Sequence, residues 1–600
     1  MEEDNNEAGA NNQKREELLN LSLAVTPEIR RRSDILEVGY DASTLRWEVI
    51  VKYHGSLKQV ENQWITVEEL IAGYAIVTLP EALLEAFTRL PEVEYIEKPK
   101  RLIYDLYEAK LNSCVVPVAR GSEGLTGREV LIAVLDSGID YLLPDFQNEA
   151  GSRILYLWDQ SLVPDEARGW RPPAGFRIGT EFTKAQIDEA IAGGRGNGSR
   201  REALAVVPQQ DVSGHGTGVA AIAASSNEDP LLRGVAPDSE LIVVKLGNSA
   251  ESGFPKTTEL MRGITYCLQK AELEERPLVI NLSFGNTYGP HDGSSLLERF
   301  LDNASEIGRT TVCVGAGNEG SSSGHTKLEV GKDEPLMAEL AVAQFETALN
   351  VQMWKAYEDV YQMMLISPDG SRYPLNLGNP PGRQTFTSGT TRILYYIGAP
   401  SPYSSLQELF FVFLPENQYL PSGIWKFILM PVDTRNGVVE FYLPSGAVRN
   451  GGTRFVRPDP NLTLTVPATA GRVISVAAYN DGLEAYADFS GRGGVGPNHD
   501  YLTGIRQKPD IAAPGVGLTA AASGGGTNSY TGTSFATPLV AGSAALLMEW
   551  GIIRGNDPFL YGEKLKACLR KGAKPIRGEA VYPNNRLGWG ALCVADSFPA

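Results

Sequence analysis

Cysteines, basic runs and long apolar runs are all scarce in this chain of 600 residues. The five cysteines are odd in number and lack Cys-x-x-Cys spacing, so we expect reduced thiols rather than a disulfide framework or a zinc site. Acidic residues (72) outnumber basic ones (54), and the net charge of −18 argues against a nucleic-acid partner or an anionic membrane surface. No stretch approaches about 18 consecutive apolar residues, so we expect no membrane span. The cysteines are Cys114, Cys267, Cys313, Cys568 and Cys593.

The N-terminus lacks a targeting signal. Residues 1–20 contain no apolar segment and too many acids for a transit peptide. We therefore expect a disordered tail over 1–20 and a chain that is made and kept in the cytoplasm. The hydrophobic fraction of 42% indicates globular protein, and the length predicts three or four units rather than one core.

Residues 21–104 have the pattern of a small α+β unit. An alternating strand is expected over 44–53, and a helix followed by a strand within 67–80. Pro80 then opens a helix over 80–90, because proline is favoured at the first helical position. A final strand is expected over 93–98.

Residues 105–325 and 466–600 have the pattern of an α/β domain. Continuous apolar runs of the kind buried in parallel sheets recur, with helices between them at 215–225 and 256–274. The runs are at 130–135, 240–247, 276–285, 308–318 and 472–480. We expect a parallel sheet with helices on both faces. Residues 326–465 contain many short apolar segments separated by turn residues, which predicts an all-β, jelly-roll-like sandwich inserted into the α/β domain.

Three segments carry chemistry. Asp136-Ser137-Gly138 follows a predicted parallel strand, where open α/β sheets place their sites. The segment 213–218 opens a helix with His215, and the segment 531–538 opens another with Ser534. A serine hydroxyl needs an adjacent base to become a nucleophile, and an aspartate on the other ring nitrogen orients a histidine base. The three segments therefore predict an Asp-His-Ser triad.

The ordered segments D-S-G, H-G-T-G and G-T-S-x-A-T-P resemble the subtilisin family of serine proteases. The segments INLSFG (280–285), GAGNEG (315–320) and KPDIAAPG (508–515) are also similar to that family. The resemblance implies a subtilisin-like fold and an endopeptidase with Asp136 as the orienting acid, His215 as the general base and Ser534 as the nucleophile. It implies no required cofactor, and it leaves room for calcium, which many subtilisins bind.

The resemblance also implies an oxyanion hole and a specificity pocket. Asn318 would donate its side-chain amide to the oxyanion, together with the backbone N–H of Ser534. The pocket would be lined by Ser283, Phe284, Gly285, Gly315, Ala316 and Gly317. Phe535 departs from the family, which usually has methionine directly after the nucleophile, and we expect it to narrow the edge of the pocket.

The N-terminal unit is similar to the inhibitory, chaperone-like propeptide of subtilisins. Counting back from Asp136 places a self-cleavage junction near 102–105, and we expect the cut between Tyr104 and Asp105. The absent leader, the propeptide and the inserted sandwich together resemble the clostridial Csp-type germination proteases. That likeness implies a propeptide that stays bound to the catalytic domain, association with the spore, and a cortex-hydrolase zymogen as the target.

Other interpretations stay open. The chain could be a scaffold or sensor whose protease fold is blocked by its propeptide, or an intracellular subtilisin of general turnover. Residues 315–320 also read as the GxGxxG of a dinucleotide site, which requires a helix directly afterwards. Asp140, Asp145 and Asp211 are expected to be structural. The remaining histidines are expected to be solvated or capping, and they are His54, His291, His325 and His499.

Overall fold

The computed structural model describes most of the chain and divides it into two compact units, Met1–Ile103 and Tyr104–Ala600. The described residues are 14–30, 34–37, 39–70, 73–99, 105–121, 124–194, 199–247, 255–329, 335–375, 377, 382–494 and 507–599.

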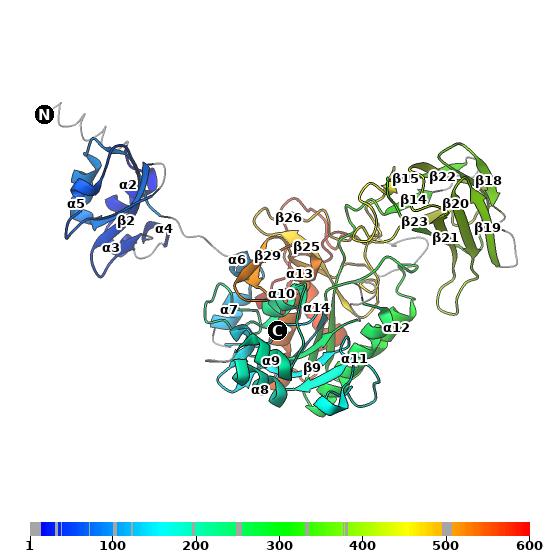
Figure 1. Ribbon diagram of the computed structural model, residues 1–600, viewed down its shortest axis with the longest axis horizontal. Coiled ribbons are helices and arrows are strands. Elements are labelled where there is room, and N and C mark those ends of the chain that lie inside the picture. The colour runs from blue at the N-terminus through cyan, green and yellow to red at the C-terminus, as the bar shows by residue number, and fades with distance from the viewer. Residues whose placement is uncertain are drawn as a thin grey trace. The chain divides into compact units, whose positions relative to one another are not determined.

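The first unit is a five-stranded antiparallel sheet with short helices (Figure 1). Strand β2 alternates buried and exposed side chains, and Trp47, Val49 and Val51 enter the core of the unit. The strands are β1 (Tyr40–Asp41), β2 (Arg46–Tyr53), β3 (Thr66–Glu69), β4 (Tyr74–Pro80) and β5 (Val93–Glu97). The helices are α2 (Glu17–Ala24), α3 (Pro27–Arg30), α4 (Asp34–Glu37) and α5 (Glu81–Thr88). The unit is α+β, as predicted.

Two details of this unit differ from expectation. Of the disordered tail expected over 1–20, residues 1–13 lie outside the described residues. Residues 14–20 are ordered, because the backbone of Glu16 donates to Ile96 of β5 at 2.9 Å and Leu19 is fully buried. The helix expected near 67 is the strand β3, which pairs antiparallel with β4. Cross-strand pairing with β4 outweighs the local helical preference of its glutamates.

The second unit is built on a nine-stranded sheet. Its order is β10-β9-β11-β6-β12-β13-β25-β26, with β27 also paired to β25, and the strands from β9 to β25 run parallel. The strands are β6 (Leu131–Asp136), β9 (Ile154–Asp159), β10 (Thr180–Thr183), β11 (Glu240–Lys245), β12 (Leu278–Leu282), β13 (Thr310–Gly315), β25 (Ile474–Asn480), β26 (Ala485–Tyr486) and β27 (Ile511–Pro514). The apolar runs of the sequence are thus the central strands, and the predicted α/β class is confirmed.

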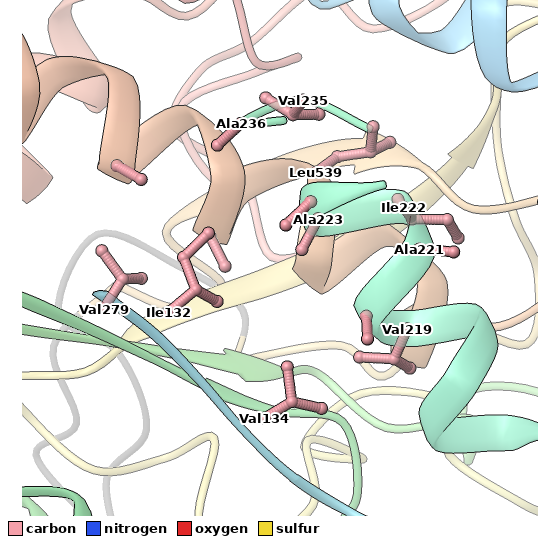
Figure 2. Packing of buried hydrophobic residues seen from close by; sticks show 14 of the residues in the cluster. Ile132, Val134, Val219, Ala221, Ile222, Ala223, Val235, Ala236, Val279 and Leu539 are labelled. Atoms are coloured by element: carbon pink, nitrogen blue, oxygen red, sulfur yellow. The ribbon is translucent and has the colours of Figure 1, made fainter. Parts of the chain in front are cut away.

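Helices cover both faces of this sheet. Successive residues of β6 point to opposite faces, so that Val134 joins one apolar core and Leu135 the other. Figure 2 shows Val219 and Ile222 of α10 and Leu539 of α13 in the first core, together with Val134. The helices are α6 (Asp105–Asn112), α7 (Val115–Arg120), α8 (Lys184–Gly194), α9 (Arg200–Val206), α10 (His215–Ala224), α11 (Thr257–Leu273), α12 (Leu296–Ala304), α13 (Thr533–Met548) and α14 (Gly562–Gly572). Two hairpins pair β7 (Gln147–Asn148) with β8 (Gly151–Ser152) and β28 (Leu518–Ala521) with β29 (Thr527–Tyr530).

Within the described residues, one helical stretch is long and apolar enough to cross a membrane, Thr533–Ile553. Most of it (83% of its most apolar window) is buried against the rest of the protein. This stretch contains α13, the central helix of the first core. Its composition is that of a core helix.

Residues 325–455 contain two antiparallel sheets that share one core. Phe411 of the first sheet and Phe427 of the second lie 5.4 Å apart between ring centroids, edge to face. The six-stranded sheet has β14 (His325–Glu329), β16 (Leu349–Ala356), β19 (Gly382–Ser388), β20 (Thr391–Ile397), β21 (Leu406–Pro415) and β23 (Val438–Tyr442). The five-stranded sheet has β15 (Leu336–Val342), β17 (Val360–Ile366), β18 (Arg372–Leu375), β22 (Gly423–Asp433) and β24 (Arg454–Phe455). The predicted all-β insert is confirmed.

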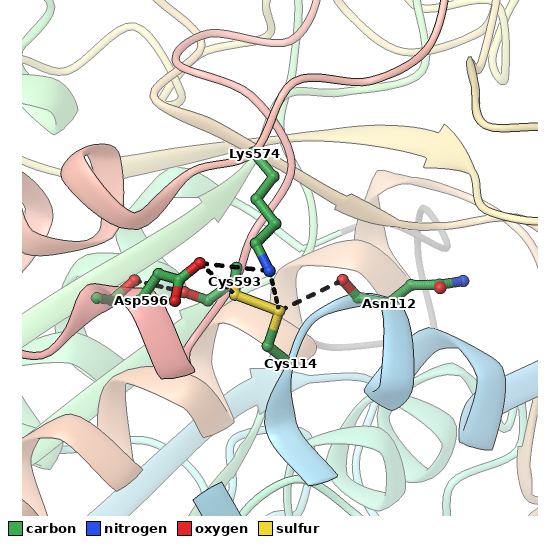
Figure 3. The surroundings of a disulfide bond; sticks show 6 residues. Asn112, Cys114, Lys574, Cys593 and Asp596 are labelled. Carbon is green, nitrogen blue, oxygen red and sulfur yellow. Dashed lines mark hydrogen bonds and ion pairs between the residues drawn. A yellow bond between two sulfur atoms is a disulfide. The ribbon is translucent and has the colours of Figure 1, made fainter. Parts of the chain in front are cut away.

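A disulfide joins Cys114, between α6 and α7, to Cys593 near the C-terminus (Figure 3). Lys574 lies beside it, with Nζ 3.2 Å from the sulfur of Cys114 and 3.3 Å from the Asp596 carboxylate. The expectation of five reduced thiols was therefore wrong for this pair, while Cys267, Cys313 and Cys568 are free. The two cysteines are 479 residues apart in the sequence, so spacing could not reveal the pairing.

Two histidines expected to be solvated or capping are instead buried where the insert meets the sheet domain. The ring of Tyr442 stacks on both His291 (4.1 Å) and His325 (4.6 Å), each of which is 2% exposed. Burial lowers the pKa of His291 to about 4. His54 is solvent-exposed, as expected, and His499 lies outside the described residues.

Candidate active site

The Asp136 carboxylate and the His215 ring meet at the carboxyl end of β6. Oδ1 of Asp136 lies 2.7 Å from Nδ1 of His215, and it also accepts the backbone N–H of Ser137 at 2.7 Å. Asp136 is 5% exposed, and His215 is the first residue of α10. The structure thus brings together two of the three residues predicted for a triad.

Glycine allows α10 to approach β6 this closely. A Cβ on Gly216 would lie 2.2 Å from the carbonyl oxygen of Gly138 and 3.1 Å from the Cβ of Asp136. Any larger residue would push the helix, and His215 with it, away from the strand. The Gly after the histidine in H-G-T-G therefore serves the Asp136–His215 contact.

Asp211 holds the start of α10 in place. Its carboxylate accepts the backbone N–H of Thr217 at 2.8 Å, the Thr217 hydroxyl at 2.7 Å and the backbone N–H of Gly214 at 2.9 Å. It also accepts the hydroxyl of Ser137 at 2.8 Å. An acid at this end of a helix satisfies N–H groups that lack helical partners. Asp211 therefore has the structural role expected of it.

Opposing effects act on the pKa of His215. Burial lowers the pKa. Three effects outweigh burial and raise the pKa above its usual value, namely the charge of Asp136, the hydrogen bond to Asp136 and the charge of Asp211. Only the neutral ring can accept a proton. Because the pKa is raised, the neutral ring predominates only at a higher pH than for an ordinary histidine.

Ser534 lies in the first turn of α13, after a backbone geometry that only glycine adopts readily. Gly532 has φ of +147°, and the helix begins at Thr533. The N–H of Ser534 donates to no acceptor among the described residues, as is usual in a first helical turn. This N–H is available to bind an anion.

Proline at position 538 frees the carbonyl of Ser534. Because Pro538 has no N–H, it cannot make the helical hydrogen bond to the residue four positions earlier. The hydroxyl of Ser283 donates to the Ser534 carbonyl instead, at 2.8 Å. Conversely, the Ser534 hydroxyl donates to the carbonyl of Ser283 at 2.8 Å. Among the described residues, the Ser534 hydroxyl therefore donates to the Ser283 carbonyl and makes no hydrogen bond with His215.

Asn318 lies in the loop that follows β13, and its side chain contacts the start of α13. Its Oδ1 accepts the backbone N–H and the hydroxyl of Thr533, both at 3.1 Å. A Cβ on Gly532 would lie 3.4 Å from Nδ2 of Asn318, so the amide nitrogen lies beside the helix start. With its oxygen held by Thr533, the amide has an NH₂ group that donates to no acceptor among the described residues and can donate near Ser534.

Phe535 packs on the ring of His215, and its expected place at the edge of the pocket stays a prediction. Its ring centroid lies 5.0 Å from that of His215 and 4.7 Å from that of Tyr530. The phenyl ring thus occupies one side of the imidazole. The residue that departs from the subtilisin pattern is in contact with the predicted general base.

Thr465 separates the two segments expected to line the specificity pocket, 283–285 and 315–317. A Cβ on Gly285 would lie 2.5 Å from Oγ1 of Thr465, and one on Gly317 would lie 2.4 Å from its Cγ2. The backbone N–H of Thr465 donates to Ala316 at 3.1 Å. Thr465 is 5% exposed, and its hydroxyl oxygen has no partner among the described residues. Thr465 was missed from the sequence, because it lies about 150 residues from one wall of the pocket.

The remaining predicted residues fall as follows. Phe284 packs against the second core, and Gly315 is the last residue of β13. Tyr104 lies outside the described residues, and Asp105 is the first residue of α6.

Residues 316–324 form turns and bends that lead into β14, so the helix that a dinucleotide site requires is missing from this described segment. Among the described residues, no group of three or more His, Cys, Asp or Glu side chains could hold a metal ion, and no calcium ligand is assigned.

The chain belongs to the subtilase family of proteases. The model of that family matches residues 127–396 and 447–590, and a model described as the Csp protease B prodomain matches residues 13–100. The first match comprises the sheet domain, the site described above and part of the insert. The second comprises the first compact unit.

Similar proteins point to the Csp type of subtilisin-like protease. The solved structure of the Clostridium perfringens CspB protease is 33% identical, covers 82% of this chain and 96% of that chain, and has a TM-score of 0.72. Subtilisin E of Bacillus subtilis is 30% identical over 251 residues, 41% of this chain and 50% of that protein. The major intracellular serine protease of the same species is 27% identical over 206 residues, 34% of this chain and 48% of that protein. The chain spans about half the length of these curated relatives.

Proposed function

We propose that this protein is a self-processing serine endopeptidase with Asp136, His215 and Ser534 as its triad. The observation that carries the proposal is the 2.7 Å contact between Asp136 and Nδ1 of His215, beside a helix start that presents Ser534. An aspartate on Nδ1 fixes the tautomer in which Nε2 can accept a proton. The family to which the chain belongs supports the same chemistry.

The reaction begins when the Ser534 hydroxyl exchanges its acceptor. It rotates away from the Ser283 carbonyl and donates to Nε2 of His215, and such catalytic hydrogen bonds often form only with substrate bound. Oγ then attacks the peptide carbonyl carbon while His215 takes the hydroxyl proton. The imidazolium that forms is stabilised by Asp136, and it gives the proton to the departing amine. Water, deprotonated by His215, hydrolyses the acyl-enzyme.

The oxyanion of each tetrahedral intermediate would be bound by two donors. These are the backbone N–H of Ser534 and the side-chain NH₂ of Asn318, whose orientation is set by Thr533. Donors fixed before the reaction stabilise developing charge without the cost of reorganisation. The partial positive charge at the N-terminus of α13 acts in the same direction.

The position of Thr465 predicts a pocket that prefers short side chains at P1, the substrate residue directly before the cleaved bond. Its side chain fills the space between Gly285 and Gly317, the two backbones between which a P1 side chain would insert. Thr465→Gly should therefore raise kcat/KM for peptides with Phe or Tyr at P1 by about tenfold or more relative to Ala. The measurement is kcat/KM for a peptide series that differs only at P1.

Thr465→Val is the matched control, because it retains the volume and loses only a hydroxyl that lacks a partner. It should keep the wild-type preference. An unchanged preference in Thr465→Gly, or a shift of equal size in Thr465→Val, would contradict the assignment.

Self-processing is tested with the full chain of 64.9 kDa. The wild type should yield two fragments with a new N-terminus near Asp105, the position expected from the sequence, and the Ser534→Ala variant one intact chain. This cut places Tyr104 at P1, and a pocket that prefers short side chains tolerates it because cleavage within one chain has a high effective concentration. We propose that the propeptide stays bound, so both fragments should elute together in size exclusion. If both proteins remained single intact chains, the proposal of self-processing would be wrong. A new N-terminus far from Asp105 would show that the cleavage site lies elsewhere.

The likeness to the CspB protease supports a finer proposal, that the enzyme activates a zymogen such as a spore cortex hydrolase. Incubation of the processed protein with a purified cortex-hydrolase zymogen should release its mature form at one site. Conversion that also occurs with Ser534→Ala would exclude this target.

The hydrogen bond between Ser534 and the Ser283 carbonyl favours one alternative, a protease fold held latent as a scaffold or sensor.

A further inference from the structure

The residue directly after Asn318 binds the insert. Glu319 is 8% exposed, and its carboxylate accepts the hydroxyl of Ser445 and, at 3.2 Å, the backbone N–H of Gly446. Ser445 and Gly446 belong to residues 444–449, hereafter the return loop, which follows the last strand of the six-stranded sheet, β23. A side chain of the predicted oxyanion segment is therefore held by the insert.

A second contact from the return loop holds the same segment. Arg449 is 8% exposed and donates to the Ser322 carbonyl at 2.5 Å and to the Pro444 carbonyl at 3.0 Å. Ser322 in turn donates its hydroxyl to the carbonyl of Glu319 at 3.1 Å. Arg449 thus ties both ends of the loop to the turn that follows Asn318.

These contacts add a second support for the segment that carries Asn318, besides the contact with α13. Thr533 holds the amide oxygen of Asn318, while the return loop holds the side chain of the next residue, Glu319, and the carbonyl of Ser322. The same contacts direct the carboxylate of Glu319 towards Ser445 and Gly446. Its charge also acts on Arg449, where burial lowers the pKa and the charge of Glu319 raises it. A carboxylate next to an oxyanion hole would otherwise oppose the charge that develops there.

We propose that the return loop, through Ser445 and Glu319, positions the oxyanion donor Asn318, which makes Ser445 and Glu319 positioning residues for the reaction. The inference rests on the proposed function. It assigns the inserted sandwich a part in the catalytic rate in addition to any other role. Since Ser445 and Glu319 act on the reaction through Asn318, which is proposed to bind the oxyanion, their loss should lower the rate of the covalent step and leave binding unchanged.

The test is the reaction of the full chain with a fluorophosphonate. An activated serine attacks its phosphorus and expels fluoride, which forms the Oγ–P bond and places the P=O oxygen where the oxyanion forms. Ser445→Ala should lower the maximal rate of modification of Ser534 about tenfold, less than the 10²–10³-fold typical of deleting an oxyanion donor itself. The concentration of half-maximal rate should not change. Ser445→Thr, which keeps the hydroxyl, should restore the wild-type rate.

Ser367→Ala is the matched control. Ser367 is another serine of the insert whose hydroxyl donates to a carboxylate, that of Asp369, in a turn between β17 and β18; Ser367 is buried and Ser445 is half-buried. It should react like the wild type. Equal losses in Ser367→Ala and Ser445→Ala would overturn the proposal, because general loosening of the insert would then explain both.

Glu319→Ala removes the acceptor instead of the donor and gives a second arm. The double variant with Ser445→Ala should react no more slowly than Glu319→Ala alone, because both changes break one contact. Additive losses, or a wild-type rate in either single variant with normal thermal unfolding, would overturn the inference and leave the proposed function intact. A wild type that neither processes itself nor reacts would overturn the proposed function, and the inference with it.

Discussion

Ser534→Ala abolishes peptide hydrolysis and self-cleavage together. The expected loss in kcat is on the order of 10⁶-fold, the size of loss that removing the nucleophile causes in subtilisin. The reason is that the Ser534 oxygen forms the acyl bond, and alanine has no atom that could attack the peptide carbonyl. The measurement is the turnover of a chromogenic peptide by purified protein.

Ser543→Ala gives the control for this change. Ser543 lies on the same helix, α13, is buried, and donates its hydroxyl to the carbonyl of Leu539 at 2.7 Å, away from the site. This variant should process itself and turn over substrate at the wild-type rate. Residual activity in Ser534→Ala above a hundredth of the wild-type value would mean that another residue is the nucleophile.

Asp136→Asn should reduce kcat/KM about 10⁴-fold while the fold persists. An amide beside Nδ1 no longer fixes the tautomer that leaves Nε2 free to accept a proton. The charge that contributes most to raising the pKa of His215 is also lost. Burial then dominates, so the pKa falls and the acidic limb of the pH profile moves to lower pH. In the wild type this limb lies above the ordinary histidine pKa of about 6.5, because activity needs the neutral ring.

Asp145→Asn is the matched change for Asp136→Asn. Asp145 is also a buried aspartate, and it accepts the Ser225 hydroxyl at 2.7 Å and the Asn227 amide at 3.2 Å, away from the histidine. Its pH profile should keep the wild-type limb. A limb that stays in place in Asp136→Asn, or moves to higher pH, would contradict the role of Asp136.

Much of the sheet domain could be predicted from the sequence because its signals are local. The apolar runs that became β6, β11, β12, β13 and β25 are buried on both faces, and such runs need no knowledge of partners to be recognised. The contact between Asp136 and His215 was predictable for a related reason. The glycines around both residues mark close backbone approach in the sequence itself.

Features that depend on distant pairing could not be predicted. The Cys114–Cys593 bond, the stack of His291 and His325 on Tyr442, and Thr465 in the pocket each join segments that the sequence keeps apart. The strand β3 was misassigned because its pairing with β4, rather than its own residues, decides its conformation. The resting hydrogen bond of Ser534 belongs to this group as well, since rotamers depend on packing.

Peptide mapping of the full chain after reaction with a fluorophosphonate tests the triad most directly. If Ser534 is a nucleophile activated by His215 and Asp136, the wild-type protein carries one phosphonyl group, on the peptide that contains Ser534. The Ser534→Ala and His215→Ala variants then carry none. A wild-type chain that remains a single unprocessed species without an adduct, or an adduct on another serine, would contradict this assignment.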